Sequence, residues 1–172
     1  MDAIEMLKRY KHNSREINDT LRSGIINSEI CAMDELLSKK EVPHTLYRLI
    51  DNKDVKFDGD IFCDPAYLSC TDDIDNFLLR TDSTDYLACL EIKMDSPFSC
   101  IHVEEFLPEY DSEGEFILPR NQNLRLLGQE TFVDIVQFDI FLEKFDSSIG
   151  SKELWGGGIK TISLYTLEIV KE

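Results

Sequence analysis

The sequence predicts an α+β fold in a single domain that spans residues 1–172. Apolar residues recur at helical spacing over about residues 1–41, and after Pro43 the pattern changes to short alternating runs typical of strands. A chain of 172 residues is long enough to bury one core, and no repeat or linker divides it. We therefore expect an N-terminal helical part at about 1–41 and a β-rich core of mixed or antiparallel strands at about 42–172.

The helical part is expected to contain separate helices. Ile4, Leu7 and Tyr10 share one face of the first helix. Ser14 is predicted to cap a second helix and Ser28 a third, because serine is favoured at helix N-caps.

The β-rich core is expected to follow in short strands. Residues 86–94 carry the clearest signal, with apolar residues at every second position. Residues 72–80 are acidic and expected to be helix-like, and 155–158 are expected to form a turn between the last two strands. Strands are expected at 45–50, 66–70, 86–94, 99–102, 116–118, 132–142 and 161–170.

The net charge of the chain restricts the kinds of partner that it is expected to bind. Eighteen basic and 34 acidic residues give 18 − 34 = −16, which disfavours docking on nucleic acid or on anionic membrane and favours cationic partners. The first ten residues lack the apolar run of a signal peptide, and no stretch approaches the length of a membrane span, so we expect a cytoplasmic protein. The five cysteines show no C-x-x-C spacing, which favours buried free thiols and predicts no metal site.

Polar side chains gather where three of the expected strands end. Arg48 lies within an apolar run, Ser69 and Thr71 share one strand face, and Glu113 and Glu115 share another. Each group alone has an ordinary explanation: a structural ion pair, a polar strand end and a solvated strand edge. Each also suits a chemistry, since a guanidinium can clamp a pyrophosphate, a hydroxyl can orient a carboxylate, and paired carboxylates can stabilise an oxocarbenium-like sugar.

Taken in order, these clusters resemble the arginine, Ser-Thr-Ser and Glu-x-Glu motifs of the exoenzyme-type (R-S-E class) mono-ADP-ribosyltransferases. That family includes bacterial actin-modifying and Rho-modifying toxins and several phage enzymes. Ile17-Asn18 and Leu21-Arg22 resemble its helical lead-in, so the resemblance covers roughly residues 5–130. It implies an ADP-ribosyltransferase-like core of two packed sheets with N-terminal helices. The segments that carry it are Leu46-Tyr47-Arg48, Tyr67 to Thr71, Leu90 to Met94 and Glu113 to Pro119.

The resemblance implies a mechanism in which NAD is a substrate and no metal takes part. Arg48 would hold the pyrophosphate, and Glu115 would bind the nicotinamide ribose and stabilise its positive charge. Ser69, with Thr71, would orient Glu115. Glu113 would hold the acceptor, which in this family is arginine when the first position is glutamate, so the expected partner is a protein with an accessible arginine.

The same resemblance suggests further contacts. Phe77 and Arg80 have the spacing of a pair that contacts nicotinamide and phosphate, and Asn18 would reach the nucleotide from its helix. Phe106 or Tyr110, in the acidic segment before Glu113, would contact the target protein. The family also implies delivery into a host or target cell as a toxin or effector, with a delivery or immunity protein as a further candidate partner.

Two departures from the family pattern leave other readings open. The Ser-Thr-Ser strand reads Ser69-Cys70-Thr71 here, and Leu49 stands where some toxins have a second arginine, so phosphate contacts are expected to be fewer. The alternatives are an NAD glycohydrolase, with water as the acceptor, and a catalytically silent relative that acts as a binding module.

Overall fold

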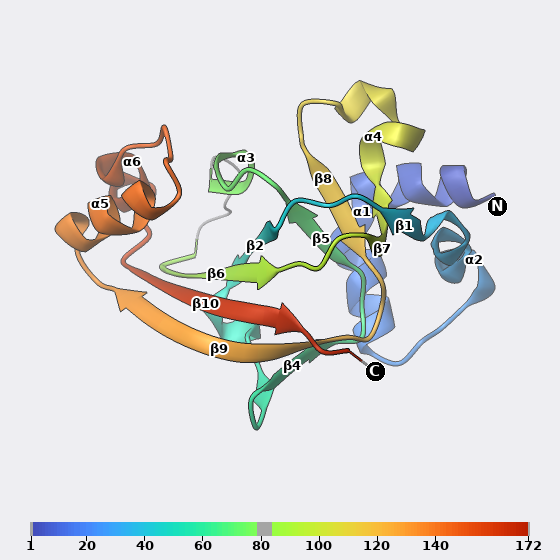
Figure 1. The fold of residues 1–172 in the computed structure, drawn as a ribbon, viewed down its shortest axis with the longest axis horizontal. Coiled ribbons are helices and arrows are strands. Elements are labelled where there is room, and N and C mark those ends of the chain that lie inside the picture. Colours follow the sequence, from blue (N-terminus) through green and yellow to red (C-terminus); the bar gives the residue numbers. More distant parts are fainter. Residues whose placement is uncertain (1, 79–83, 172) are drawn as a thin grey trace.

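A computed structural model describes residues 2–78 and 84–171, and the structural statements below concern these residues (Figure 1). Its α-helices are α1 (Ala3–Arg22), α2 (Ser28–Cys31), α3 (Asp75–Leu78), α4 (Val103–Phe106), α5 (Ile135–Lys144) and α6 (Ser151–Gly156), and its 3₁₀ helices are η1 (Ala32–Leu36), η2 (Asn52–Asp54) and η3 (Pro108–Tyr110). Its strands are β1 (Ser38–Lys40), β2 (Thr45–Asp51), β3 (Phe57–Asp58), β4 (Ile61–Asp64), β5 (Leu68–Thr71), β6 (Tyr86–Lys93), β7 (Phe98–His102), β8 (Glu115–Leu118), β9 (Gln122–Phe132) and β10 (Thr161–Ile169).

The strands form one hydrogen-bonded sheet in the order β1-β7-β8-β5-β2-β6-β10-β9-β4-β3. Among the described residues, β6 and β10 pair in parallel and the other strand pairs are antiparallel, so the sheet is mixed. The two halves meet at β5 and β2, whose ladder is reduced to the single pair Tyr47 and Thr71. The predicted α+β class with N-terminal helices is confirmed.

The halves of the sheet pack against each other, as the predicted pair of sheets requires. Leu68 and Cys70 of β5 and Phe116 of β8 share one apolar cluster with Leu46 of β2 and Ile92 of β6. A second apolar cluster packs α1 on β7, β8 and the residues just before β5, and a third packs α5 and α6 on β6 and β10. The layers are therefore helix, half-sheet, half-sheet and helices, with α1 and the pair α5–α6 at opposite ends of Figure 1.

The N-terminal helices differ from the expectation at their boundaries. Asp2 caps α1 with Glu5 in a reciprocal capping box, and the helix continues to Arg22. Ser14 is therefore not an N-cap. The expected boundary between a first and a second helix is instead a kink at Asn13, the one non-helical residue inside α1. Asn27, not Ser28, caps the next helix by accepting a hydrogen bond from the Ile30 amide.

The expected strand at 132–142 is wrong, since it covers the end of β9 and most of α5. Asp134 accepts a hydrogen bond from the Gln137 amide and caps the helix, and the buried residues Phe138, Phe141 and Leu142 have helical spacing. The exposed Val136 adds apolar character to the opposite face, which makes the segment resemble a buried strand. The expected turn at 155–158 is likewise partly wrong, because 155–156 end α6.

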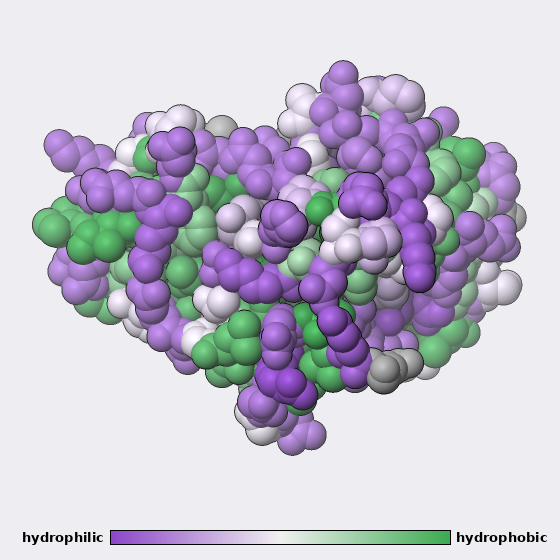
Figure 2. Space-filling view, in the orientation of Figure 1, coloured by the Kyte–Doolittle hydropathy of each residue, from purple (hydrophilic) through white to green (hydrophobic). Residues whose placement is uncertain are grey.

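The outer surface is mostly hydrophilic. Figure 2 shows polar side chains over most of the face seen, with an apolar area over α5 at one end. Val136 and Ile140 of α5 are among the exposed large apolar residues. Across residues 2–78 and 84–171, no helix combines the length and the apolarity that spanning a bilayer requires.

Candidate active site

The centre of the candidate site is the carboxylate of Glu115. Strands β5 and β8 are antiparallel neighbours, with Thr71 opposite Glu115, so Ser69 lies diagonally across from Glu115 on the same face. The Ser69 hydroxyl donates a hydrogen bond to Oε1 of Glu115. Only 7% of the Glu115 side chain is exposed, and a carboxylate so buried needs partners of this kind.

A lysine that the sequence reasoning did not include completes this group. Lys11 of α1 donates from Nζ to Oε2 of Glu113 and to Oε2 of Glu115. Its side chain is 10% exposed, and its ammonium lies 4.7 Å from the centre of the Tyr110 ring. Burial opposes the charge of Lys11, but the nearby Glu115 and Glu113 prevail and raise the pKa of the ammonium above its ordinary value.

The loop that carries Glu113 is fixed by Thr71. The Thr71 hydroxyl and the Asn76 side-chain amide both donate to the Glu113 carbonyl, at 3.1 and 2.9 Å. The Asp72 amide donates to the carbonyl of Gly114 at 3.2 Å. Thr71 thus holds the backbone beside the glutamates, whereas Ser69 alone of the two hydroxyls contacts the Glu115 carboxylate.

Arg48 lies on β2, the strand next to β5 in the sheet. Its Nη1 donates to the Ser69 carbonyl at 3.0 Å, and its guanidinium lies 6.0 Å from the centre of the Phe77 ring. A guanidinium has five N–H donors, and among the described residues this is its one hydrogen bond, so it retains donors for an anion. Arg80 lies outside the described residues.

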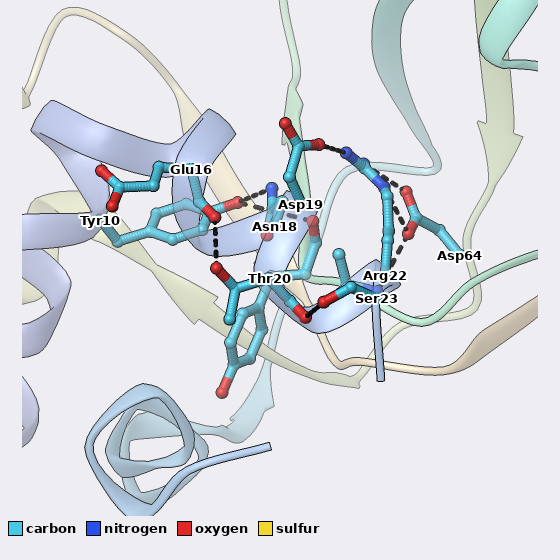
Figure 3. Close-up of polar contacts among 10 residues, drawn as sticks. Tyr10, Glu16, Asn18, Asp19, Thr20, Arg22, Ser23 and Asp64 are labelled. Atoms are coloured by element: carbon cyan, nitrogen blue, oxygen red, sulfur yellow. Dashed lines mark hydrogen bonds and ion pairs between the residues drawn. The ribbon is translucent and has the colours of Figure 1, made fainter. Parts of the chain in front are cut away.

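Asn18 is buried on α1, with 3% exposure, and its side chain is half satisfied. Its Nδ2 donates to the Tyr10 hydroxyl at 3.0 Å, which in turn donates to the Tyr67 carbonyl at 3.5 Å (Figure 3). Within the described part of the chain, Oδ1 of Asn18 has no hydrogen-bond partner. Burial raises the pKa of Tyr10 to about 12, with the charge of Arg48 acting against the rise.

The C-terminal end of α1 is clamped to the sheet. Arg22 donates to both carboxylate oxygens of Asp64, at 3.1 and 2.6 Å, and to Asp19 at 3.1 Å (Figure 3). Such a paired contact between guanidinium and carboxylate fixes direction as well as distance. The contact therefore fixes the position of Asn18, which lies one helical turn before Arg22, relative to β4.

The two aromatic residues expected to recognise a target lie on α4 and η3. Phe106 and Tyr110 are half-buried and pack against the apolar cluster under α1. Tyr110 faces the ammonium of Lys11, so the acidic segment and α1 meet beside the glutamates.

Other parts of the described structure show weaker candidates for a binding site. Two surface hollows, one beside Phe57 and Val170 and one along α1 around Arg15 and Thr20, do not include Glu115 in their lining. No group of three or more histidine, cysteine or carboxylate side chains within 2–78 and 84–171 is arranged to hold a metal ion.

Comparison with known proteins identifies solved structures that share the fold of this chain. No protein-family model and no curated protein matches the chain. Plx2a, an ADP-ribosyltransferase toxin from Paenibacillus larvae, matches with a TM-score of 0.65 and 17% identity over 98% of this chain and 86% of its own. C3larvin, an ADP-ribosyltransferase toxin of the same organism, has a TM-score of 0.56 and 16% identity, over 97% and 86%. BECa, an ADP-ribosylating toxin of C. perfringens solved with NADH, has a TM-score of 0.63 and 14% identity, over 98% of this chain and 43% of its own.

These matches define the class of the fold. The chain is folded like the ADP-ribosyltransferase toxins, as the resemblance of the three motifs implied.

Proposed function

We propose that the protein is an NAD-dependent mono-ADP-ribosyltransferase, with residues 1–172 forming one catalytic domain, that moves ADP-ribose from NAD to an arginine of a target protein and releases nicotinamide. The observation that carries the proposal is the buried Glu115 carboxylate, bound by Ser69 within the fold of the ADP-ribosyltransferase toxins. The presence of NADH in the structure of BECa supports NAD as the substrate.

Glu115 is assigned the main electrostatic role. It accepts a hydrogen bond from the 2′-hydroxyl of the nicotinamide ribose and faces the ribose carbon C1′. When the C1′–N bond breaks, its electron pair leaves with nicotinamide, and C1′ becomes positive. A carboxylate fixed beforehand in a site of low polarity stabilises that charge better than water does. Ser69 keeps the carboxylate in this orientation.

The remaining nucleotide contacts are assigned to residues around β5. Arg48 binds the pyrophosphate, for which its planar guanidinium is suited. Phe77, which contacts Arg48, packs near the nicotinamide, and Arg80 contributes a phosphate contact. Asn18 offers to the nucleotide its Oδ1, which has no hydrogen-bond partner among the described residues.

Glu113 is assigned to the acceptor. The target guanidinium binds its carboxylate, one guanidinium nitrogen bonds to C1′, and the proton which that nitrogen loses passes to Glu113. Phe106 of α4 and Tyr110 of η3, whose ring lies beside the ammonium of Lys11, would contact the target protein. The net charge of −16 favours a basic surface around the target arginine. The toxins of the same fold support action on a host or target-cell protein after delivery.

The first experiment measures nicotinamide release from NAD by the purified protein and by Glu115→Gln, with labelled NAD and a cell lysate in parallel. We expect release and protein labelling that Glu115→Gln lowers by at least about 100-fold. Glu109→Gln, an exposed glutamate of the same acidic segment, is the matched control. Absence of both release and NAD binding would instead favour a silent binding module.

A second experiment separates the transferase from an NAD glycohydrolase. Glu113→Gln should abolish arginine modification while leaving much of the NAD hydrolysis, because the carboxylate assigned to the acceptor is lost whereas Glu115 and the nucleotide contacts remain. Equal loss of both activities would rule out this division of roles. Release that depends on Glu115 without labelling of any lysate protein would favour the glycohydrolase.

A further inference from the structure

The ammonium of Lys11 lies between the two glutamates of the candidate site. It donates hydrogen bonds to both carboxylates, and the side chains of Lys11, Glu113 and Glu115 are 10%, 16% and 7% exposed. A salt bridge this far from solvent is weakly screened, so it contributes strongly to the local electrostatic potential. The three side chains therefore form one unit.

This arrangement conflicts with the charge that the proposed reaction needs. Glu113 is assigned to a cationic guanidinium and Glu115 to a ribose that becomes positive. An ammonium bound to both carboxylates already neutralises much of the charge that those two cations would use. The ammonium of Lys11 thus occupies the position that the proposed reaction assigns to the positively charged guanidinium of the acceptor.

We propose that Lys11 is a specificity-determining residue, whose ammonium occupies the acceptor position between Glu113 and Glu115 and gives it up to a guanidinium but not to water. The inference rests on the proposed function and deepens it: it explains how the site would favour transfer to arginine over hydrolysis of NAD. The acceptor chemistry that it selects is a planar, doubly donating cation.

A guanidinium can replace Lys11 because it brings the same charge with better geometry. Its parallel N–H donors match a carboxylate, whereas an ammonium acts as a point charge. Water carries no charge, so displacing Lys11 by water would remove from the buried Glu115 carboxylate the cation that is bound to it among the described residues. The hydrolytic state is therefore disfavoured until an arginine arrives.

The displaced lysine also has a place to go. Its ammonium lies 4.7 Å from the centre of the Tyr110 ring, within the range of a cation–π contact. The four-carbon side chain lets it move toward that ring and the solvent without a change in α1. Tyr110 would then contact both the resident lysine and the arriving target.

The test compares Lys11→Met, Lys11→Arg and the control Lys8→Met, an exposed lysine on the same helix. For each protein we measure nicotinamide release with NAD alone and with L-arginine methyl ester as acceptor. Lys11→Met should raise release without acceptor by at least about threefold and lower the ratio of transfer to hydrolysis by about tenfold. Lys11→Arg should hydrolyse NAD no faster than the wild type, because it retains the cation.

A second measurement needs no variant. Brief acetylation of the wild-type protein, followed by mass spectrometry, compares the reactivity of Lys11 with and without NAD and L-arginine methyl ester. We expect Lys11 to be protected in the protein alone and at least about threefold more reactive when both compounds are bound. Lys8 should react equally in both conditions.

The outcomes separate the two proposals. Release that depends on Glu115 but is unchanged or lowered in Lys11→Met, or a Lys11 that is no more reactive with acceptor present, would overturn the role of Lys11 alone. Inactivity of the wild type and of every variant would overturn the proposed function and this inference with it. Fast hydrolysis of NAD alone in Lys11→Met, together with transfer to L-arginine methyl ester and slow hydrolysis in the wild type, would support the inference.

Discussion

At the scale of single residues, the site depends on charges held by specific neighbours. Glu115 has one oxygen bound by Ser69 and the other by Lys11, so both of its oxygens have a partner in the protein. Changing either neighbour should alter the direction or the effective charge of the carboxylate without removing it.

Ser69→Ala tests the orientation of Glu115. We expect kcat for nicotinamide release to fall by about 10- to 100-fold, because a misaligned carboxylate stabilises the ribose cation poorly. NAD affinity, measured by calorimetry, should change by less than about threefold, since the main phosphate contact is assigned to Arg48.

Ser163→Ala is the matched control for that prediction. Ser163 is also a buried sheet serine, with its hydroxyl bound to Tyr86 and Thr131, but it lies on β10, away from the glutamates. It should lower the melting temperature and leave kcat unchanged. A loss of kcat as large as that of Ser69→Ala would contradict the assigned role.

Sequence reasoning grouped most of the expected site residues but missed Lys11. The strand motifs placed Ser69 and Glu115 together because both lie on strands with fixed alternation. Lys11 comes from a helix about a hundred residues earlier, and no local pattern marks it except its spacing of two helical turns from Asn18. A contact between distant elements depends on how α1 packs on the sheet, which the sequence does not express locally.

At the scale of elements, the loop between η3 and β8 sets the position of both glutamates. Gly114 has φ of +53°, a left-handed conformation, and a Cβ at this position would lie 2.0 Å from Oδ1 of Asp72. The side chain of Asp72 is exposed and can move, but the backbone conformation still disfavours a larger residue.

Gly114→Ala should therefore destabilise the protein by about 1 kcal/mol and lower its melting temperature by about 2–4 °C. Activity should fall further than stability explains, because Glu113 and Glu115 flank the strained residue. Gly128→Ala is the control, since its added Cβ meets nothing within 4 Å. Thermal unfolding and nicotinamide release are measured on both, and equal effects would refute the role of the loop.

Helix α5 offers a test of the helical assignment for a segment that the sequence suggested was a strand. Phe138→Ala should cost about 3–5 kcal/mol, because the ring is fully buried between α5 and the sheet. Val136→Ala, at 65% exposure, should change the free energy of unfolding by less than about 0.5 kcal/mol. Urea unfolding measures both, and a large cost at Val136 would indicate a different packing of the segment.

The elements that the sequence predicted well are strands whose apolar residues alternate along the chain or are buried on both faces. Strand β6 falls at 86–93 against an expected 86–94, and β8 at 115–118 against 116–118. Strand β9 was missed because its apolar alternation is limited to Leu124 and Leu126, is interrupted by the exposed Leu127, and is followed by the exposed polar residues 129–131. The segment after it has apolar residues on both faces, which does not distinguish a helix from a strand.

At the scale of the whole molecule, the interior contains several thiols. Burial raises the pKa of Cys70 to about 12 and that of Cys100 to about 11, and it also raises the pKa of Cys89. A group whose pKa is raised by folding stabilises the native state fully below its unfolded pKa, here about 8.5 for a thiol. The stabilisation is then lost as the pH rises through the folded pKa.

The melting temperature should therefore fall progressively above about pH 8.5 and be insensitive to these thiols below it. Differential scanning fluorimetry from pH 7 to pH 10.5 checks the prediction. Cys89→Ala should show a shallower fall, whereas Cys63→Ala, at an exposed position, should follow the wild type more closely. A flat profile across this range would contradict the linkage.

Strand β10 occupies the middle of the sheet, between β6 and β9, although it comes latest in the sequence. Strand β6 keeps an open edge until 161–169 arrive, and β9 reaches the central strands only through β10. Pairings between residues so far apart in the chain form slowly, and an open edge is prone to wrong pairing. Any process that handles the polypeptide from its N-terminal end, such as synthesis on a ribosome or passage through a narrow channel, therefore leaves this sheet unfinished until its central strand has followed.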